Sequence, residues 1–505
     1  MILKIEGTEA RYYIQTICLL FFPGSKFGEK EEAGDDVPEV TVRVRKEEGD
    51  RYFATASIKM NGEEAEGEGS AEPGENITSA SRVEKLAIGR AVFDAGKKFF
   101  GYTPPWGVLT GVRPSKVASE LLDSGIGVQR ARRVLRDEYF LNPRKAALAV
   151  SVASAEYKLT RRLPENLCSV YISIPFCPSR CSYCSFISSS VQKLFGVLED
   201  YLARLLKDVE YTFETIRRVG LTPATVYIGG GTPTVLNEAQ LTSLLSTVAK
   251  CCDTDRLLEY TLEAGRPDTI TSEKLSIAKE YGVTRISVNP QTLNEDVLRA
   301  IGRHHTVEDF YRAYDIAQNS GIRHINVDLI AGLPGDRFGS FAATLDKIIS
   351  LAPSNITVHA LSVKKSATLN DPGHHVYSLT GGDAATAVEY SELQTKLAGY
   401  KPYYMYRQKN TVGNLENVGY SMEGAEGYYN IFMMEELHSI FAVGAGAVTK
   451  LVEYCPPSKG NSRIERIFVP KYPYEYLRDI DKIQFGCPEE DRQPLREKII
   501  EFFQK

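Results

Sequence analysis

The chain has 505 residues, more than one hydrophobic core ordinarily supports, so two or three domains are expected. Hydrophobic residues make up 43% and charged residues 25%, as in soluble globular proteins, and a net charge of −5 gives no general signal for nucleic-acid binding. The apolar run Ile17 to Pro23 is too short to span a bilayer and lacks the features of a signal peptide. The nine cysteines show no disulfide framework. A cytoplasmic protein without a membrane span is therefore expected.

The first part of the chain, residues 1–160, is expected to form an N-terminal α+β domain without chemistry of its own. Apolar and polar residues alternate in two runs that indicate a hairpin, and a later run has helical spacing. The expected elements are a strand within Tyr12–Phe22, a hairpin of Val37–Val44 and Arg51–Met60, an acidic glycine-rich loop at Glu63–Gly74, and a helix at Ser79–Phe100.

From Cys168 onward, short apolar runs alternate with segments of helical spacing, which indicates a parallel sheet covered by helices. The expected strands are Ser169–Ile174, Ala224–Ile228, Glu259–Glu263, Arg285–Asn289, His324–Ile330 and Asn355–Leu361. The expected helices are Leu194–Val219, Asn237–Cys251, Ser272–Tyr281, Asn294–Ile301, Val307–Asn319 and Phe338–Leu351. The pattern does not distinguish an open sheet from a barrel, but in both arrangements functional residues gather at the carboxyl ends of the strands.

Three cysteines, Cys177, Cys181 and Cys184, follow the first of these strands within eight residues. Thiolates at this spacing can hold one metal centre, and three ligands leave one iron of a four-iron cluster open. Structural zinc is the alternative, but zinc sites usually close with four ligands in paired spacing. The nearest further cysteine, Cys168, is up to about 30 Å away along an extended strand. The spacing therefore favours an iron–sulfur cluster.

The segment Cys177-Pro-Ser-Arg-Cys-Ser-Tyr-Cys184 resembles the CxxxCxxC signature of radical S-adenosylmethionine (SAM) enzymes. With its flanking residues, and with Gly107-Val-Leu-Thr-Gly-Val-Arg-Pro-Ser-Lys116 upstream, the chain resembles the HemZ-type branch of the oxygen-independent coproporphyrinogen III oxidases (dehydrogenases). The resemblance implies a partial (β/α)6 radical SAM barrel at 161–380, between an N-terminal α+β domain at 1–160 and a C-terminal α+β extension on the substrate side at 381–505. It also implies a [4Fe–4S] cluster on the three cysteines, one SAM at the open iron and a second SAM beside it.

Residues at the expected strand ends match SAM-lining positions of this family. Without Cβ atoms, Gly229 to Gly231 would let the backbone approach SAM closely, and Glu263 would accept hydrogen bonds from its amino group or ribose. A tight glycine turn and structural salt bridges are the alternative explanations. By the resemblance, the first SAM is lined by Tyr171, Gly230, Glu263 and Val448, and the second by Tyr183, Gly231, Thr232, Gln291, Arg303, Asp328 and Ser362. Among the histidines, His304 and His305 are expected to form a surface pair, and His359 to lie in the core.

The C-terminal part contains Tyr403-Tyr-Met-Tyr-Arg-Gln-Lys-Asn410, which is rich in aromatic and cationic residues. Tyrosines together with Arg407 and Lys409 would suit a porphyrinogen, because arginine can hold a propionate with two hydrogen bonds. A half-buried strand with a charged outer face explains the same pattern. Phe186 stands where the well-known bacterial oxidases carry another cysteine, and the haem-binding segment of the related haem chaperones is absent.

The resemblance implies oxidative decarboxylation of coproporphyrinogen III propionates to vinyl groups, which gives protoporphyrinogen IX. A 5′-deoxyadenosyl radical would remove a hydrogen atom, and a reduced flavodoxin or ferredoxin would supply the electron. Two other functions fit the same residues: a different radical SAM reaction on a tetrapyrrole, such as methyl transfer with haem ring opening, and a haem chaperone that does not act as an enzyme.

Overall fold

The structure is a computed structural model that describes residues 1–28, 36–74, 80–184, 189–190, 195–362, 369, 379–408, 411–455, 462–478 and 489–504. The chain forms two compact units. Unit 1 contains Met1–Ser154, His375–Ala385 and Met405–Glu416, and unit 2 contains Ala155–His374, Thr386–Tyr404 and Asn417–Lys505. The boundary at 154 lies near the expected one at 160, whereas residues 381–505 are shared between both units. Among the described residues, no helix is long and apolar enough to cross a membrane.

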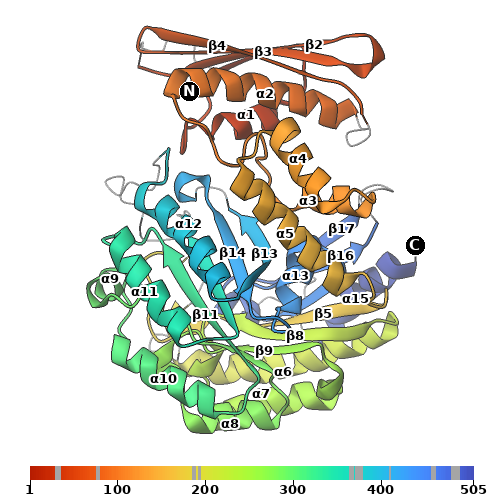
Figure 1. Cartoon of the computed structure of the whole chain (residues 1–505). Helices are drawn as coiled ribbons and strands as arrows, with labels where there is room; N and C mark the ends of the chain where they lie inside the picture. Colours follow the sequence, from red (N-terminus) through yellow and green to blue (C-terminus); the bar gives the residue numbers. More distant parts are fainter. Residues whose placement is uncertain are drawn as a thin grey trace. The chain divides into compact units, whose positions relative to one another are not determined.

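Unit 1 contains a four-stranded sheet in the order β1-β2-β3-β4. Its strands are β1 (Ile2–Glu6), β2 (Glu39–Lys46), β3 (Tyr52–Met60) and β4 (Glu63–Ala71), with β1 parallel to β2 and the other neighbours antiparallel. The long helix α2 (Ala80–Phe100) lies along one face of this sheet (Figure 1). The expected hairpin and the expected helix are therefore confirmed. The shorter helices α3 (Lys116–Asp123), α4 (Val128–Tyr139) and α5 (Pro143–Thr160) follow.

Two expectations for unit 1 are wrong. Residues Arg11–Cys18, expected as part of a strand, form helix α1, which buries Ile14, Ile17 and Cys18 at helical spacing. The expected loop at 63–74 is instead the strand β4, whose acidic side chains alternate with small residues that face α2. A Cβ atom on Gly67 would lie 2.3 Å from the backbone nitrogen of Ala95, so only glycine permits this close packing of strand and helix.

Unit 2 is built around an eleven-stranded sheet in the order β13-β14-β12-β11-β10-β9-β8-β5-β15-β16-β17. Its centre is six parallel strands in chain order, as expected: β5 (Leu167–Ile174), β8 (Thr222–Gly230), β9 (Glu259–Glu263), β10 (Arg285–Ser287), β11 (His324–Ala331) and β12 (Asn355–Ala360). The sheet begins with β13 and ends with β17, and among the described residues these two strands do not pair with each other. The barrel of the six parallel strands is therefore partial, a partial (β/α)6 barrel, and not closed.

The expected helices connect these strands. They are α6 (Phe195–Arg218), α7 (Glu238–Cys251), α8 (Ser272–Glu280), α9 (Glu295–Ala300), α10 (Val307–Asn319) and α11 (Phe338–Ser350). Helices α6, α7, α8 and α10 lie together on the outer side of the strands (Figure 1). Capping boxes define the starts of α7, at Asn237 and Gln240, and of α10, at Thr306 and Asp309. The strands read as apolar runs because both of their faces are covered; Val226, Leu262 and Val327 are fully buried.

Strands from the C-terminal part extend this sheet at both ends. β14 (Glu416–Ser421) pairs antiparallel with β12, and β13 (Lys401–Arg407) lies at that edge. At the other end, β15 (Ile440–Val443) runs parallel to β5, followed by β16 (Val448–Glu453) and β17 (Arg463–Phe468) in antiparallel pairing. Helices α12 (Gly382–Leu397), α13 (Tyr428–Glu435), α14 (Pro473–Arg478) and α15 (Glu489–Gln504) complete the chain.

Candidate active site at the carboxyl ends of the strands

The cysteine loop begins where β5 ends. The short strand β6 (Phe176–Cys177) pairs with β7 (Ser189–Ser190), and the loop then continues through the other two cysteines. Cys181 is buried, whereas Cys177 and Cys184 are half-buried, and none of the three forms a disulfide with another described residue. The backbone N–H of Ser182 donates to the carbonyl of Ile301 at 3.0 Å, which ties the loop to the end of α9. Backbone hydrogen bonds to a neighbouring element therefore define the position of the loop.

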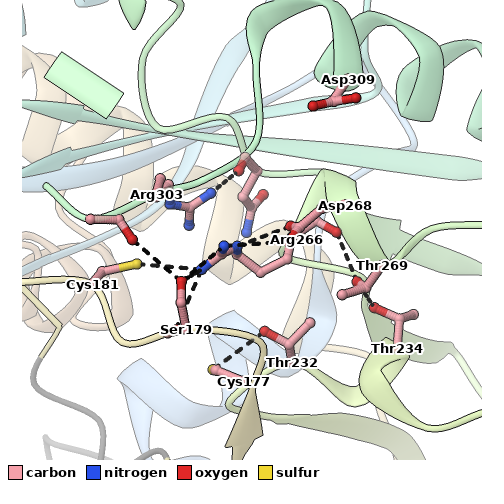
Figure 2. Close-up of polar contacts among 12 residues, drawn as sticks. Cys177, Ser179, Cys181, Thr232, Thr234, Arg266, Asp268, Thr269, Arg303 and Asp309 are labelled. Atoms are coloured by element: carbon pink, nitrogen blue, oxygen red, sulfur yellow. Dashed lines mark hydrogen bonds and ion pairs between the residues drawn. The ribbon is translucent and has the colours of Figure 1, made fainter. Parts of the chain in front are cut away.

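The glycine-rich end of β8 packs directly against this loop. The N–H of Gly231 donates to the carbonyl of Ile174, and the N–H of Thr232 to the carbonyl of Phe176, both at 2.8 Å. A Cβ atom on Gly231 would lie 2.4 Å from the carbonyl oxygen of Phe176. The hydroxyl of Thr232 is 3.4 Å from the sulfur of Cys177 (Figure 2). Because Gly231 has no Cβ, the end of β8 can pack against the cysteine loop at Phe176. The sequence interpretation explained these glycines only by close approach of the backbone to SAM.

Arg266, in the loop after β9, is a site residue that sequence reasoning missed. Its side chain is 4% exposed, and its Nη1 lies 3.7 Å from the sulfur of Cys181 and 3.2 Å from the hydroxyl of Ser179. Its Nε donates to Asp268 at 3.2 Å (Figure 2). Its position three residues after Glu263, at the carboxyl end of a parallel strand, was the available signal. The Arg266 guanidinium therefore places a buried positive charge beside the sulfur of Cys181.

Arg303, an expected SAM-lining residue, lies on another side of the same thiol. It is buried, and its Nη1 donates to the carbonyl of Asn289 at 2.5 Å. Burial opposes its charge, but the neighbouring Tyr183 and Cys181 raise the pKa of the Arg303 guanidinium. The structure therefore brings the expected residues Tyr183 and Arg303 together with Cys181.

His305 lies in the same region and corrects the expectation of a surface histidine pair. His304 is exposed, but His305 is 3% exposed, and neither of its ring nitrogens has a hydrogen-bond partner among the described residues. Burial, together with the charges of Arg303 and Arg266, lowers the pKa of His305 to about 3. The imidazole is consequently neutral at physiological pH. The expectation that His359 lies in the core is also wrong, since its side chain is 26% exposed and its Nε2 lies 3.8 Å from Asp328.

Glu263 and Asp328 are two expected site carboxylates with opposite pKa shifts. Glu263 accepts hydrogen bonds from the hydroxyl of Tyr227 and the backbone N–H of Gly230, yet burial and the nearby Asp328 raise its pKa to about 7. Burial also raises the pKa of Asp328, but this effect is outweighed. A hydrogen bond and the charge of His359, together with hydrogen bonds from Asn326 and Thr357, lower the pKa of Asp328 below its ordinary value. Asp328 is therefore ionised at neutral pH, whereas Glu263 can gain or lose a proton there.

Tyrosine side chains form the wall beside Glu263. Tyr171, Tyr227 and Tyr429 stack, with ring centroids 4.4 Å apart for Tyr227 and Tyr429 and 6.0 Å apart for Tyr171 and Tyr227. The expected residues Tyr171, Gly230 and Glu263 thus lie in one place. Tyr227 and Tyr429 join them without having been expected from the sequence.

Gln291 has the strongest structural indication of a ligand. Its φ of 69° is rare for a residue with a side chain, and backbone hydrogen bonds to Asp328 and Ile330 hold it in place. The residue is 7% exposed, and its side-chain oxygen Oε1 is buried without a partner among the described residues. A buried acceptor without a partner, on a strained backbone at a strand end, is typical of a binding site.

The remaining expected residues lie on other elements or cannot be placed. Ser362 lies two residues after the end of β12 and is half-buried, and Val448 begins β16 with 36% exposure, two positions from β5 in the strand order. Arg407 belongs to unit 1, where it is buried. Lys409 and Phe186 lie outside the described residues.

The residues present fit an iron–sulfur cluster with SAM. Three cysteines on one loop would provide thiolate ligands, and Arg266 and Arg303 provide positive charge beside one of them. The acceptors that an ammonium group requires are present at Glu263 and Gln291. In the described parts of the chain, no three His, Cys, Asp or Glu side chains are grouped closely enough to hold a single metal ion, and this applies to the three cysteines as well.

Comparison with known proteins gives four findings. The sequence profile of the Radical SAM superfamily matches residues 171–348. The oxygen-independent coproporphyrinogen-III oxidase-like protein HemZ of Bacillus subtilis is 37% identical over 380 residues, covering 74% of this chain and 75% of that protein. The heme chaperone HemW of the same organism is 35% identical over 198 residues, covering 39% and 51% of the two chains. Among solved structures, coproporphyrinogen III oxidase (HemN) from Escherichia coli has a TM-score of 0.46 at 19% identity, over 70% of this chain and 81% of that one.

The superfamily profile begins at Tyr171 and includes the cysteine loop and the strand ends described above. Membership in this superfamily implies a [4Fe–4S] cluster and SAM. The match to HemZ covers about three quarters of both chains and so extends well beyond the shared radical SAM segment. The chain therefore belongs to the HemZ-type family of oxygen-independent coproporphyrinogen III oxidase-like proteins, within the radical SAM superfamily.

Proposed function

We propose that this protein is a coproporphyrinogen III dehydrogenase, which converts propionate side chains of its substrate to vinyl groups by radical chemistry. The observation that carries the proposal is the three-cysteine loop, hydrogen-bonded to the end of β8 and of α9, at the strand edge that also holds Glu263 and Gln291. The similarity to HemZ, named as a coproporphyrinogen-III oxidase-like protein, supports the choice of substrate class.

Each group of residues has a part in this proposal. Cys177, Cys181 and Cys184 would hold a [4Fe–4S] cluster and leave one iron for SAM. Bound together, the cluster and SAM would supply a 5′-deoxyadenosyl radical that takes a hydrogen atom from a propionate. The resulting propionate radical would lose carbon dioxide and pass one electron to an external one-electron acceptor, which leaves a vinyl group. Glu263, once ionised, accepts hydrogen bonds from the SAM ammonium group or ribose, while the stacked tyrosines exclude water.

We further propose that a second SAM binds beside the first. Tyr183, Arg303 and Asp328 match family positions for it, and Gln291 offers its buried Oε1 as an acceptor. Arg303 provides a cation for the SAM carboxylate. The electron would come from a reduced flavodoxin or ferredoxin in the cytoplasm.

A haem chaperone is the second candidate, because HemW, named as a heme chaperone, is 35% identical over 198 residues. A different radical reaction on a tetrapyrrole is the third. The candidates differ in what they release: vinyl-bearing porphyrinogens for the dehydrogenase, another modified tetrapyrrole for the third candidate, and unmodified haem for the chaperone.

An anaerobic turnover experiment tests the proposal. The cluster is reconstituted, SAM, a reductant and coproporphyrinogen III are added, and the porphyrin products are weighed by mass spectrometry. Stepwise loss of carbon dioxide and two hydrogen atoms is the expected result. Unchanged porphyrin with formation of 5′-deoxyadenosine would show that the protein cleaves SAM but acts on a substrate other than coproporphyrinogen III. Unchanged porphyrin without SAM cleavage, despite an intact cluster, would favour the chaperone.

A further inference from the structure

Unit 1 contains a cavity of about 770 Å³ that the proposed function does not use, here called the α1 cavity. It lies among helix α1, the segment 110–112 and the residues Arg407, Gln408, Thr411 and Asn414, all within unit 1. Its walls are mainly apolar and aromatic, formed by Tyr12, Tyr13, Leu19, Leu20, Phe27 and Val112. Its volume lies in the range of sites for ligands of drug size or larger.

The cationic end of the α1 cavity is Arg407, which is 7% exposed. Its Nη1 donates to the carbonyl of Leu109 at 2.6 Å, and its guanidinium lies 5.9 Å from the centre of the Trp106 indole ring system. These contacts orient the guanidinium but do not neutralise it. Among the described residues it forms no ion pair. Burial lowers the pKa of Arg407 to about 10, despite the opposing influence of Glu416.

Glu416 already has two partners of its own. Lys145 donates to its Oε1 at 2.5 Å and the indole N–H of Trp106 to its Oε2 at 2.7 Å, and the Lys145 and Glu416 side chains are 3% and 0% exposed. Lys145 therefore neutralises the buried Glu416 carboxylate, and Arg407 is a second buried cation with no ion pair among the described residues. Buried charges in proteins are normally paired, so the excess positive charge at Arg407 requires an anion. The cavity beside it provides the space for one.

We propose that the α1 cavity binds a tetrapyrrole, with a ligand carboxylate paired to Arg407 and the macrocycle against Tyr12, Tyr13 and Phe27. The identification of the ligand as a tetrapyrrole rests on the proposed function; the need for a large apolar carboxylate rests on the cavity alone. A second cation, Lys85, lines the same cavity and is exposed. One carboxylate, the exposed Glu9, also lines it. With two cations, one carboxylate and mostly apolar walls, the cavity suits a macrocycle with two carboxylates better than one with four.

The test measures binding of protoporphyrin IX, which carries two carboxylates, to the full-length, cluster-loaded protein without SAM. Porphyrin fluorescence anisotropy reports the Kd. We expect Arg407→Gln to weaken binding by about tenfold or more, because it removes a charge-assisted bidentate contact, and Arg407→Lys to weaken it less. Equal affinity in the wild-type protein and Arg407→Gln would overturn the proposal.

A second pair of variants guards against misfolding of the Arg407 variants. Val112 is 56% exposed at the cavity, so Val112→Glu places a negative charge beside the ligand without disturbing a core. Val128 is 38% exposed on α4 and does not line the α1 cavity, so Val128→Glu is the matched control. We expect weaker porphyrin binding for Val112→Glu and wild-type affinity for Val128→Glu. Equal affinities of the two variants would contradict the assignment of the cavity.

Oleate serves as the competing apolar carboxylate. If oleate displaces porphyrin only at concentrations far above the porphyrin Kd, the cavity is a tetrapyrrole site. If oleate binds in a way that depends on Arg407 and porphyrin does not bind, the choice of ligand is overturned. The turnover experiment separates this inference from the proposed function. If coproporphyrinogen III is not converted but porphyrin binding depends on Arg407, the proposed function fails and the cavity stands. If coproporphyrinogen III is converted but porphyrin binds Arg407→Gln as tightly as wild type, the proposed function stands and the assignment of the cavity fails.

Discussion

The Nη1 of Arg266 lies 3.7 Å from the sulfur of Cys181, while Asp268 and Ser179 hold the same guanidinium from other directions (Figure 2). Arg266 thus connects the loop after β9 to the cysteine loop after β5. It brings a buried positive charge to a thiol that is expected to carry a cluster. Net charge and hydrogen bonds to the ligand sulfurs are two determinants of the reduction potential of such clusters.

Replacing Arg266 is expected to change that potential. Arg266→Gln removes a positive charge beside Cys181, which disfavours the more negative reduced state, so the midpoint potential of the reconstituted cluster should fall. Arg266→Lys should give an intermediate value. Potentiometric titration followed by electron paramagnetic resonance measures the effect. The matched control is Arg256→Gln, whose side chain is 85% exposed. A wild-type potential in Arg266→Gln, at full iron content, would show that this contact has no electronic role.

Glu263 is expected to make stability depend on pH. Its folded-state pKa of about 7 lies above the ordinary value of 4.5, so the folded protein binds this proton more strongly than the unfolded chain does. The free energy of unfolding must then decrease as the pH rises from about 4.5 to 7. Glu263→Gln removes this loss, so the stability of the variant relative to wild type should rise across that window, by on the order of 3 kcal/mol in total.

Denaturation of the cluster-free protein at several pH values checks the Glu263 prediction. The glutamine can still accept hydrogen bonds from Tyr227 and Gly230, so packing is preserved. The control is Glu280→Gln, at an exposed position at the end of α8. A stability difference between Glu263→Gln and wild type that does not vary with pH would contradict the prediction.

Gly231→Ala is expected to destabilise the cysteine loop. The added methyl group would lie 2.4 Å from the carbonyl oxygen of Phe176, so either β6 or the end of β8 must move. We expect a loss of about 3 kcal/mol, with poorer iron loading because the loop shifts. Gly196→Ala, in α6, meets no atom within 4 Å and should change stability by less than about 1 kcal/mol. Thermal unfolding and iron content measure both effects, and equal behaviour of the two variants would exclude this steric role.

The sequence predicted the sheet of unit 2 well because its strands carry strong local signals. β9 and α10 have the expected bounds, since each combines an apolar pattern with a clear start and stop. In α1, aromatic and β-branched residues favoured a strand, whereas burial at positions 14, 17 and 18 selected a helix. The acidic, glycine-rich pattern of β4 resembles a loop; its small residues are explained only by the tight contact with α2.

The cysteines and the strand-end residues were predictable for the same reason, since a motif and a topology mark them. Arg266 and His305 were not. The side chain of Arg266 contacts Ser179 and Cys181, which are far away in the chain, and His305 is influenced by its burial and by the charge of the distant Arg266 as well as the nearby Arg303. Local pattern contains no information about such contacts, nor about the partnerless oxygen of Gln291.

The last prediction concerns which cysteines hold the cluster. Cys168 is fully buried on β5, and burial raises the pKa of its thiol, as expected of a structural cysteine rather than a ligand. Cys181→Ala is expected to abolish the visible absorbance of the reconstituted cluster together with SAM cleavage. Cys168→Ala should keep both and lose only about 1 kcal/mol of stability through the small cavity it leaves. Iron and sulfide analysis distinguishes the two variants. Loss of the cluster in a folded Cys168→Ala variant would indicate a fourth ligand and therefore a four-ligand site. Retention of the cluster in Cys181→Ala would require a different ligand set.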